Sequence, residues 1–206
     1  MSARLVVLAS GAGTTLQAIL DAAGDPGFGA TVVAVGTDRD GTGARERAVA
    51  AGIPVFTERL EDHPDREAFN VATAARVAAF QPDLLVLAGY MKILSPRVIG
   101  RFPTINTHPS LLPAFPGASA VRDALAAGVK VSGVTVHWVD EGVDTGPIIA
   151  QEAVPVETGD TEQALRARIQ AVERGLFVTT IAQIVRAAGA LGGHQVPADV
   201  HVQEEA

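Results

Sequence analysis

Short runs of Val, Leu and Ala alternate with longer amphipathic segments along the first half of the chain. Up to residue 89, the interiors of these runs carry no polar residue at alternate positions, which is typical of strands buried on both faces. The segments between them repeat apolar residues at helical spacing. Strands that alternate with helices predict a doubly wound α/β fold with a mostly parallel sheet. The expected strands are 5–9, 31–37, 53–56, 82–89 and 102–108, and the expected helices are 15–23, 43–52 and 66–80, with a short helix opening at Ser95 and Pro96.

The second half of the chain follows a different pattern. Segments 129–140 and 147–156 are both rich in β-forming residues, and no helix separates them, so they predict an antiparallel extension of the sheet. The stretch 161–189 has a strong helical pattern. We expect a single domain over residues 1–189, followed by a C-terminal tail, 190–206, that has too little apolar content for a core.

The composition narrows the classes of partner. Hydrophobic residues make up 48% of the 206 positions and indicate a globular chain. The formal net charge is −7 and the basic residues are scattered, so nucleic acid and anionic membranes are disfavoured as partners. The absence of cysteine excludes disulfides and thiolate metal sites. No run reaches the ~18 apolar residues of a membrane span, and 5–9 is too short for a secretory signal, so we expect a cytoplasmic protein.

A glycine turn, SGAG, follows the first expected strand and precedes a helix that Thr14 or Thr15 is expected to cap. Such a turn presents backbone N–H groups at a helix N-terminus, where phosphate is favoured. A dinucleotide site would require a third glycine, but that position is Leu16. Asp38 fits a polar turn better than a ribose contact. From the glycines alone, a phosphate site and a plain turn remain open alternatives.

The stretch INTHPSLLPAFPG, residues 105–117, holds Asn106 and His108 in a proline-rich frame. Residues two apart on a strand project to the same side, and Pro109 keeps His108 extended. Both side chains are therefore expected at the carboxyl end of the sheet, where open α/β sheets bind ligands. An amide N–H can stabilise an oxyanion, and an imidazole can transfer a proton. The alternative is that Asn106 caps a turn and His108 is an ordinary surface group.

A second candidate loop is DEGVDTGPII, residues 140–149. Asp140, Glu141 and Asp144 crowd a glycine-rich turn, for which turn-forming aspartate is the simpler explanation. A carboxylate aimed at an imidazole would instead stabilise the imidazolium, so Asp144 and His108 form a candidate acid–base pair. These two residues are 36 positions apart, and spacing alone cannot establish a contact.

The other histidines are weaker candidates. His63, His194 and His201 lie in polar segments and are expected on the surface. His137 lies on a β-rich run and could line the site, although a structural role is favoured. No clustered His and Asp pattern suggests a metal, and no GxSxG motif suggests a serine hydrolase.

Together, INTHPSLLPAFPG and GVTVHWVDEGVDTGPII resemble the formyltransferases that use 10-formyltetrahydrofolate. The segments SGAGTTLQAIL, LVLAGYMKILSP and ERGLF extend the resemblance over residues 4–185. It implies a Rossmann-like formyltransferase fold and transfer of the formyl group to the amine of glycinamide ribotide (5′-phosphoribosylglycinamide), a step of purine biosynthesis. It also implies two small-molecule substrates and no metal, and it leaves a homodimer open.

The same resemblance assigns roles to individual residues. The amide and the protonated imidazole would stabilise the oxyanion, and the carboxylate would support the imidazole and help to route a proton. This catalytic trio would be Asn106, His108 and Asp144. The ribotide would contact Gly13, Thr14, Thr15, Gln170 and Glu173. The folate would contact Arg66, Met91, Lys92, Ile93, Leu94, Asn106, Asp140 and Asp144. A cis peptide bond is expected between Leu112 and Pro113.

The chain departs from the family's pattern at three places. The phosphate turn reads GAGTT where relatives often have GNGSN, so Thr15 replaces the longer reach of an asparagine. Ser119 and Val121 stand in a region where relatives frequently carry histidine. Lys92 stands where arginine is common, so a point charge replaces a planar fork.

Three other functions remain open from the sequence. A formyltetrahydrofolate hydrolase would use the same trio with water as the nucleophile, but relatives of that type carry an extra N-terminal domain. A methionyl-tRNA formyltransferase would need an added C-terminal domain and a basic face. A non-catalytic nucleotide-binding module would use the glycine turn alone.

Overall fold

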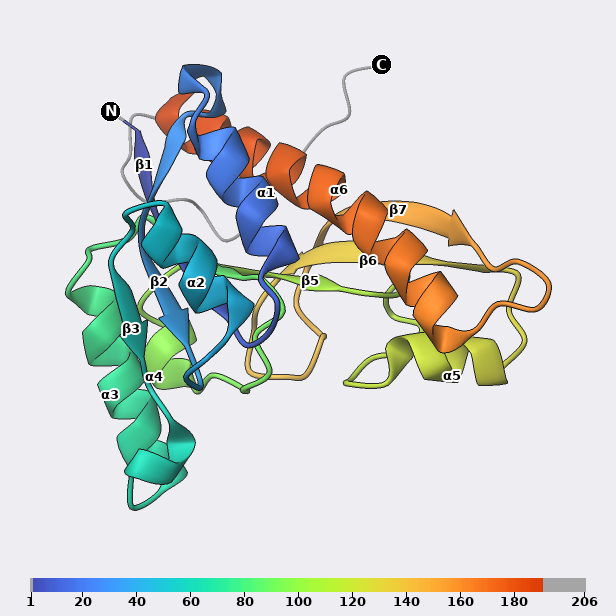
Figure 1. Cartoon of the computed structure of the whole chain (residues 1–206), viewed down its shortest axis with the longest axis horizontal. Coiled ribbons are helices and arrows are strands. Elements are labelled where there is room, and N and C mark those ends of the chain that lie inside the picture. Colours follow the sequence, from blue (N-terminus) through green and yellow to red (C-terminus); the bar gives the residue numbers. More distant parts are fainter. Residues whose placement is uncertain (1, 191–206) are drawn as a thin grey trace.

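The computed structural model describes residues 2–190 (Figure 1). The predictions for the tail beyond Ala190, including His194 and His201, lie outside the described residues. The strands are β1 (Ala3–Ala9), β2 (Ala30–Thr37), β3 (Val55–Thr57), β4 (Leu84–Leu87), β5 (Thr104–His108), β6 (Val131–Trp138) and β7 (Ile148–Pro155). The α-helices are α1 (Thr14–Ala23), α2 (Gly43–Ala50), α3 (Arg66–Ala78), α4 (Pro96–Ile99), α5 (Ala120–Ala126) and α6 (Glu162–Ala190), and two short 3₁₀ helices are η1 (Pro26–Phe28) and η2 (Leu60–Asp62).

All seven strands form one sheet in the order β3-β2-β1-β4-β5-β6-β7. The pairs from β3 to β5 are parallel, whereas β6 pairs antiparallel with both β5 and β7. The fold class predicted from the sequence is confirmed, including the antiparallel extension. The parallel half needs crossover helices, and these cover both faces of the sheet.

Three apolar clusters pack the helices against the sheet. On one face, Leu16 of α1 and Phe177 of α6 are fully buried against the sheet, together with Ala44 of α2. On the other face, Val77 of α3 and Val98 of α4 are equally buried. Figure 1 shows α1 and α6 running side by side across the first of these faces. Among the helices of residues 2–190, even the 29-residue α6 lacks the apolar stretch that a membrane span requires.

Helix α5 has no counterpart among the elements expected from the sequence. It is only seven residues long and buries Ala120, Val121 and Ala124 against the start of α6 and the antiparallel strands. So short a segment carries too few helical repeats to be recognised without its packing partner. Val121 is therefore a core residue, with 1% of its surface exposed.

The prediction that a threonine is the N-cap residue of α1 is wrong. Neither Thr14 nor Thr15 precedes the helix, because its N-cap is Gly13 in the left-handed conformation with φ 71°. A Cβ atom added at Gly13 would lie 2.6 Å from the Cα atom of Ala44, so only glycine allows α2 to approach this closely. Gly13 offers no side chain to the helix, and the N–H groups of the first turn are left to other acceptors.

Candidate active site

Strands β5 and β6 place the predicted polar residues on one face of the sheet. Their antiparallel register pairs Asn106 with His137 and His108 with Thr135. Because successive strand residues point to opposite faces, these four side chains share a face, and Thr107 points to the other one. Asn106 and His108 therefore project to the same side, at the carboxyl end of β5.

Asp144 lies against His108 although the two residues are distant in sequence. Its Oδ2 atom is 3.2 Å from Nδ1 of His108, and its Oδ1 atom is 3.6 Å from Nε2 of His137. The backbone N–H of Gly117 also donates a 2.8 Å hydrogen bond to Oδ2. Asp144 adopts a left-handed conformation with φ 56°, which aspartate tolerates better than most residues. The loop of residues 140–147 thus turns its carboxylate back over the sheet.

Both nitrogens of the buried His108 ring face hydrogen-bond acceptors. Nε2 donates a 2.8 Å hydrogen bond to the carbonyl oxygen of Phe115, and Nδ1 faces the carboxylate of Asp144. A neutral imidazole has one N–H group and could satisfy only one of these two acceptors, whereas an imidazolium satisfies both. His108 is 4% exposed, so water cannot replace either partner. The ring is thus held between the carbonyl group of Phe115 and the carboxylate of Asp144.

The pKa of Asp144 lies below its ordinary value. Burial by itself raises this pKa, because it penalises the charged carboxylate. The nearby His137, the hydrogen bond from the Gly117 N–H and the charge of His108 outweigh that penalty and lower it. Asp144 therefore stays ionised throughout the neutral range.

His137, for which the sequence favoured a structural role, lies between the other two groups. Its Nδ1–H donates to the carbonyl oxygen of Trp138 at 2.8 Å, and its Nε2 accepts a hydrogen bond from the Asn106 amide at 3.2 Å. This contact orients Asn106 and occupies one of the two N–H groups of its amide. The one signal in the sequence was the position of His137 on a β-rich run.

The proline-rich loop is tied to β6 and β7 by hydrogen bonds. The hydroxyl of Thr135, which is fully buried, donates to the carbonyl oxygen of Ser110 at 2.7 Å and accepts the N–H of Leu112 at 3.0 Å. Gln151 of β7 donates to the carbonyl oxygen of Leu112 and to the Thr135 hydroxyl, both at 2.9 Å. The peptide bond between Leu112 and Pro113 is cis, as the family resemblance implied.

The residues expected at the ribotide lie around the start of α1. Glu173 on α6 accepts hydrogen bonds from the hydroxyls of Thr15 at 3.0 Å and Thr107 at 2.9 Å, both at Oε1. Thr14, which precedes Thr15 in α1, is exposed. Gln170, one turn before Glu173 in α6, is also exposed. Thr107 was not among the residues singled out in the sequence.

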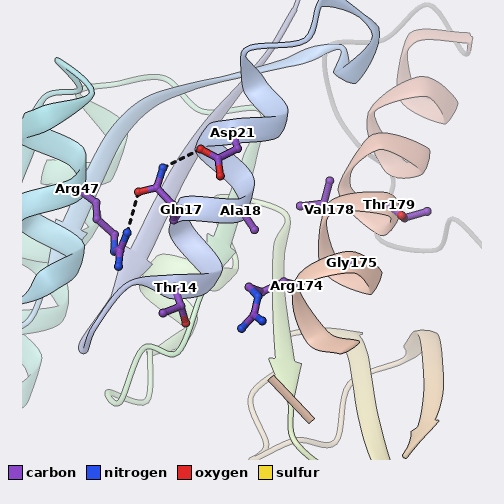
Figure 2. Close-up of a pocket in the computed structure, with 9 residues that line it drawn as sticks. All are labelled: Thr14, Gln17, Ala18, Asp21, Arg47, Arg174, Gly175, Val178 and Thr179. Carbon is purple, nitrogen blue, oxygen red and sulfur yellow. Dashed lines mark hydrogen bonds between the residues drawn. The ribbon is translucent and has the colours of Figure 1, made fainter. Parts of the chain in front are cut away.

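A groove of about 680 Å³ runs between α1 and α6, beside this cluster (Figure 2). Arg47 and Arg174 line it together with Thr14, and within residues 2–190 neither arginine forms an ion pair. Figure 2 shows Arg174 reaching from α6 toward the first turn of α1. Asn106, His108 and Asp144 do not line this groove, so it adjoins the glycine turn but is not the reaction centre.

The segment expected at the folate, residues 91–94, follows β4. Met91 and Ile93 are 66% and 60% exposed, which leaves two large apolar side chains available to a ligand. Leu94 differs, because its side chain is packed into the core and only its backbone can be reached. Arg66 donates a 3.2 Å hydrogen bond to the carbonyl oxygen of Ile93.

Asp38 and Ser10 anchor the start of this segment. Nζ of Lys92 lies 3.4 Å from Oδ2 of Asp38, whose side chain is fully buried, and the Ser10 hydroxyl accepts the N–H of Met91 at 2.8 Å. Burial raises the pKa of Asp38, but contacts with Arg39, Ser10 and Lys92 outweigh it and lower the pKa. The polar turn expected at Asp38 thus holds a buried carboxylate that pairs with Lys92 from another segment, which its sequence context did not indicate.

Asp140 fits the simpler explanation given for its loop. Its Oδ1 atom accepts hydrogen bonds from the N–H of Gly142 at 3.0 Å and from the hydroxyl of Thr145 at 2.7 Å, within one exposed turn. These contacts shape the loop that carries Asp144. Among residues 2–190, no group of three or more His, Asp or Glu side chains is placed to hold a metal ion.

Comparisons with known proteins relate this geometry to one family. The model of the formyl transferase family matches residues 3–181. The phosphoribosylglycinamide formyltransferase of Mycobacterium tuberculosis is 57% identical over 185 residues, which cover 88% of this chain and 85% of the relative. Glycinamide ribonucleotide transformylase 1 from Symbiobacterium toebii superposes with a TM-score of 0.88 at 45% identity, covering 90% of this chain and 89% of that one. Phosphoribosylglycinamide formyltransferase from Bacillus halodurans gives 0.86 at 42% identity, covering 90% and 96%.

Proposed function

The chain belongs to the formyl transferase family, and we propose that it transfers the formyl group of 10-formyltetrahydrofolate to the amine of 5′-phosphoribosylglycinamide. The observation that carries the proposal is the contact between Asp144 and His108 beside Asn106. It joins an amide, an imidazole and a carboxylate, the three groups that formyl transfer between two nitrogens needs. The relatives named above support the choice of substrates.

The reaction exchanges one C–N bond for another. The amine of the ribotide attacks the formyl carbon, and the carbonyl oxygen becomes an oxyanion. The positive charge of His108 and the second N–H of the Asn106 amide stabilise this oxyanion, since His137 occupies only the first N–H. When the bond from the formyl carbon to N10 of the folate breaks, N10 gains a proton and the amine nitrogen loses one. The His108–Asp144 pair carries that proton.

The two substrates would bind on different sides of β5. The uncapped first turn of α1, with Gly13, Thr14 and Thr15, takes the ribotide phosphate, and Arg174 adds a positive charge beside it. Gln170 and Glu173 lie further along the ribotide. Exposed Met91 and Ile93 offer apolar surface to the pteridine, with the loop of residues 140–144 over it. Arg66 lies near Ile93 for the glutamate tail of the folate.

The finer expectations remain proposals. We expect a cytoplasmic enzyme that acts on these two small molecules without a metal, without a nucleic acid and without a membrane. A homodimer stays open. The domain is expected to end with α6, so that residues 190–206 are dispensable for the reaction.

The test is a rate measurement with each substrate alone and with both. Purified protein is mixed with 10-formyltetrahydrofolate, and release of tetrahydrofolate is followed with and without the ribotide. We expect release only when the ribotide is present. Release without the ribotide would favour a hydrolase, and no release in either case would favour a non-catalytic nucleotide-binding protein.

A further inference from the structure

Two threonine hydroxyls converge on a single oxygen of Glu173. Oγ1 of Thr15 and Oγ1 of Thr107 lie 3.0 Å and 2.9 Å from Oε1. An ionised carboxylate can only accept hydrogen bonds, so both hydroxyls are donors. Thr15 is 8% exposed and is held by α1, while Thr107 is held by β5. Three elements that are distant in sequence therefore fix one carboxylate.

The arrangement leaves the other half of this carboxylate available. Within residues 2–190, Oε2 of Glu173 accepts no hydrogen bond, and no arginine or lysine lies within ion-pair distance of Glu173. Two neutral donors orient the group without cancelling its charge. A charged oxygen held in this way is a strong acceptor for hydroxyl groups of a ligand.

The position of Glu173 suggests which hydroxyls these are. Thr15 follows Thr14 in the first turn of α1, where the phosphate is proposed to bind, and Thr107 lies between Asn106 and His108. Because Glu173 is hydrogen-bonded to a neighbour of each of these positions, the part of a ligand that joins a phosphate at α1 to an amine at His108 would run near this carboxylate at the end of β5. In the ribotide that part is the ribose, which carries two neighbouring hydroxyls.

We propose that Thr15 and Thr107 are positioning residues that aim Glu173 at the ribose hydroxyls, and that they thereby set the preference of the enzyme for a ribotide over a deoxyribotide. The proposal rests on the proposed function. It assigns a role to Thr107, whose side chain points away from Asn106 and His108 although it lies between them. It also explains how this chain works with Thr15 at a position where the family often has asparagine.

Isosteric substitutions test the proposal. Thr107→Val and Thr15→Val keep the shape of each side chain and delete one donor. Loss of one hydrogen bond to a charged group is expected to raise KM for the ribotide about tenfold, or 1.4 kcal/mol, with little change in KM for the folate. Thr107→Ser keeps the hydroxyl donor, so its KM for the ribotide should stay near the wild-type value. Thr180→Val is the matched control, because the Thr180 hydroxyl donates within α6 to the carbonyl oxygen of Leu176.

A second test compares kcat/KM for the ribotide with kcat/KM for the analogue that lacks the 2′-hydroxyl. A purely structural role of the threonines would not change this ratio. Wild-type enzyme should prefer the ribotide in kcat/KM, and Thr107→Val and Glu173→Gln should both reduce that preference. The double variant Thr107→Val/Glu173→Gln should be no worse than Glu173→Gln alone, because the threonine acts through the carboxylate. Thr15→Val carries the same test if Thr107→Val does not fold.

The outcomes separate this inference from the proposed function. Wild-type enzyme without formyl transfer to the ribotide would overturn the function itself. Active wild-type enzyme with unchanged ribotide KM and unchanged sugar preference in both valine variants would overturn the positioning role. A lower melting temperature together with an equal rise in KM for both substrates would also overturn it. That result would indicate a purely structural contact between α1, β5 and α6.

Discussion

Replacing Asp144 by asparagine removes one negative charge while keeping the shape of the side chain. The asparagine oxygen can still accept the N–H of Gly117, which now donates at 2.8 Å. Asparagine also tolerates the left-handed backbone at φ 56°, so the loop is expected to keep its course. What changes is the partner of His108, whose Nδ1 atom would face a neutral group in place of a carboxylate.

The size of the effect follows from the geometry. Opposite charges about 4 Å apart attract by about 4 kcal/mol at an effective dielectric constant near 20. Asp144 is 12% exposed as a side chain, so solvent screens only part of this attraction. If about 3 kcal/mol of it is lost in the transition state, kcat falls by roughly a hundredfold. KM for either substrate should change much less, because Asp144 acts through His108, whose charge stabilises the oxyanion of the transition state.

The assay is steady-state formyl transfer across pH 5 to 9, with circular dichroism to check folding. Asp123→Asn is a suitable control, since Asp123 lies on the exposed side of α5 and, within residues 2–190, its only ion-pair partner is Arg122. A folded Asp144→Asn enzyme with near wild-type kcat and an unchanged pH profile would refute the reasoning.

Stability should depend on pH through the same carboxylate. The pKa of Asp144 is lowered in the folded state from its ordinary value of 3.8, so its ionised form stabilises the fold above that value. This contribution is lost as the pH falls through the lowered, folded-state pKa. Urea unfolding of wild type and Asp144→Asn should therefore differ at pH 7 and converge at lower pH. An equal difference at all pH values would contradict the assigned charge.

Three further predictions concern other parts of the site. His108→Ala should retain folate binding in calorimetry but lose most of kcat, and lost folate affinity would instead assign His108 a binding role. Gly13→Ala should destabilise the fold by about 2 kcal/mol or more in urea unfolding, because its Cβ would meet Ala44 in a left-handed backbone; unchanged stability would show that the turn can relax. Asp38→Asn should raise KM for the folate and not for the ribotide, since Lys92 loses its buried partner; equal effects on both would contradict an anchor for the folate segment.

Local sequence patterns predicted the strands and the sheet well. The run 5–9 is apolar at every position, and 31–37 is apolar apart from its two terminal threonines, because both faces of the sheet are covered; that signal needs no knowledge of partners. The pairing of Asn106 with His108 followed from strand alternation alone. The acidic loop made Asp144 a candidate partner of His108, but only the family resemblance assigned it to the catalytic trio, because no local pattern could give the distance between the two residues.

The features that sequence patterns missed depend on contacts between distant segments. Thr107 acquires its partner only when α6 places Glu173 beside β5. The sequence neighbours of Asp38 indicate a polar turn, yet its side chain is buried and pairs with Lys92 from another loop. The cap of α1 was misplaced because the close approach of α2 requires glycine where threonine would be the better cap. Each of these positions obeys a tertiary constraint that overrides its local preference.

Glu173 lies 158 positions after Thr15, on the final helix of the described chain. During synthesis on the ribosome, α1 and β5 emerge well before α6 is made. A nascent chain at that point already carries Asn106 and His108, but it has no carboxylate to join them to the glycine turn, and the apolar face that α6 covers is still open. The docking of one helix thus completes both the core and the substrate site, so a prematurely terminated polypeptide would be inactive and exposed to proteases at once.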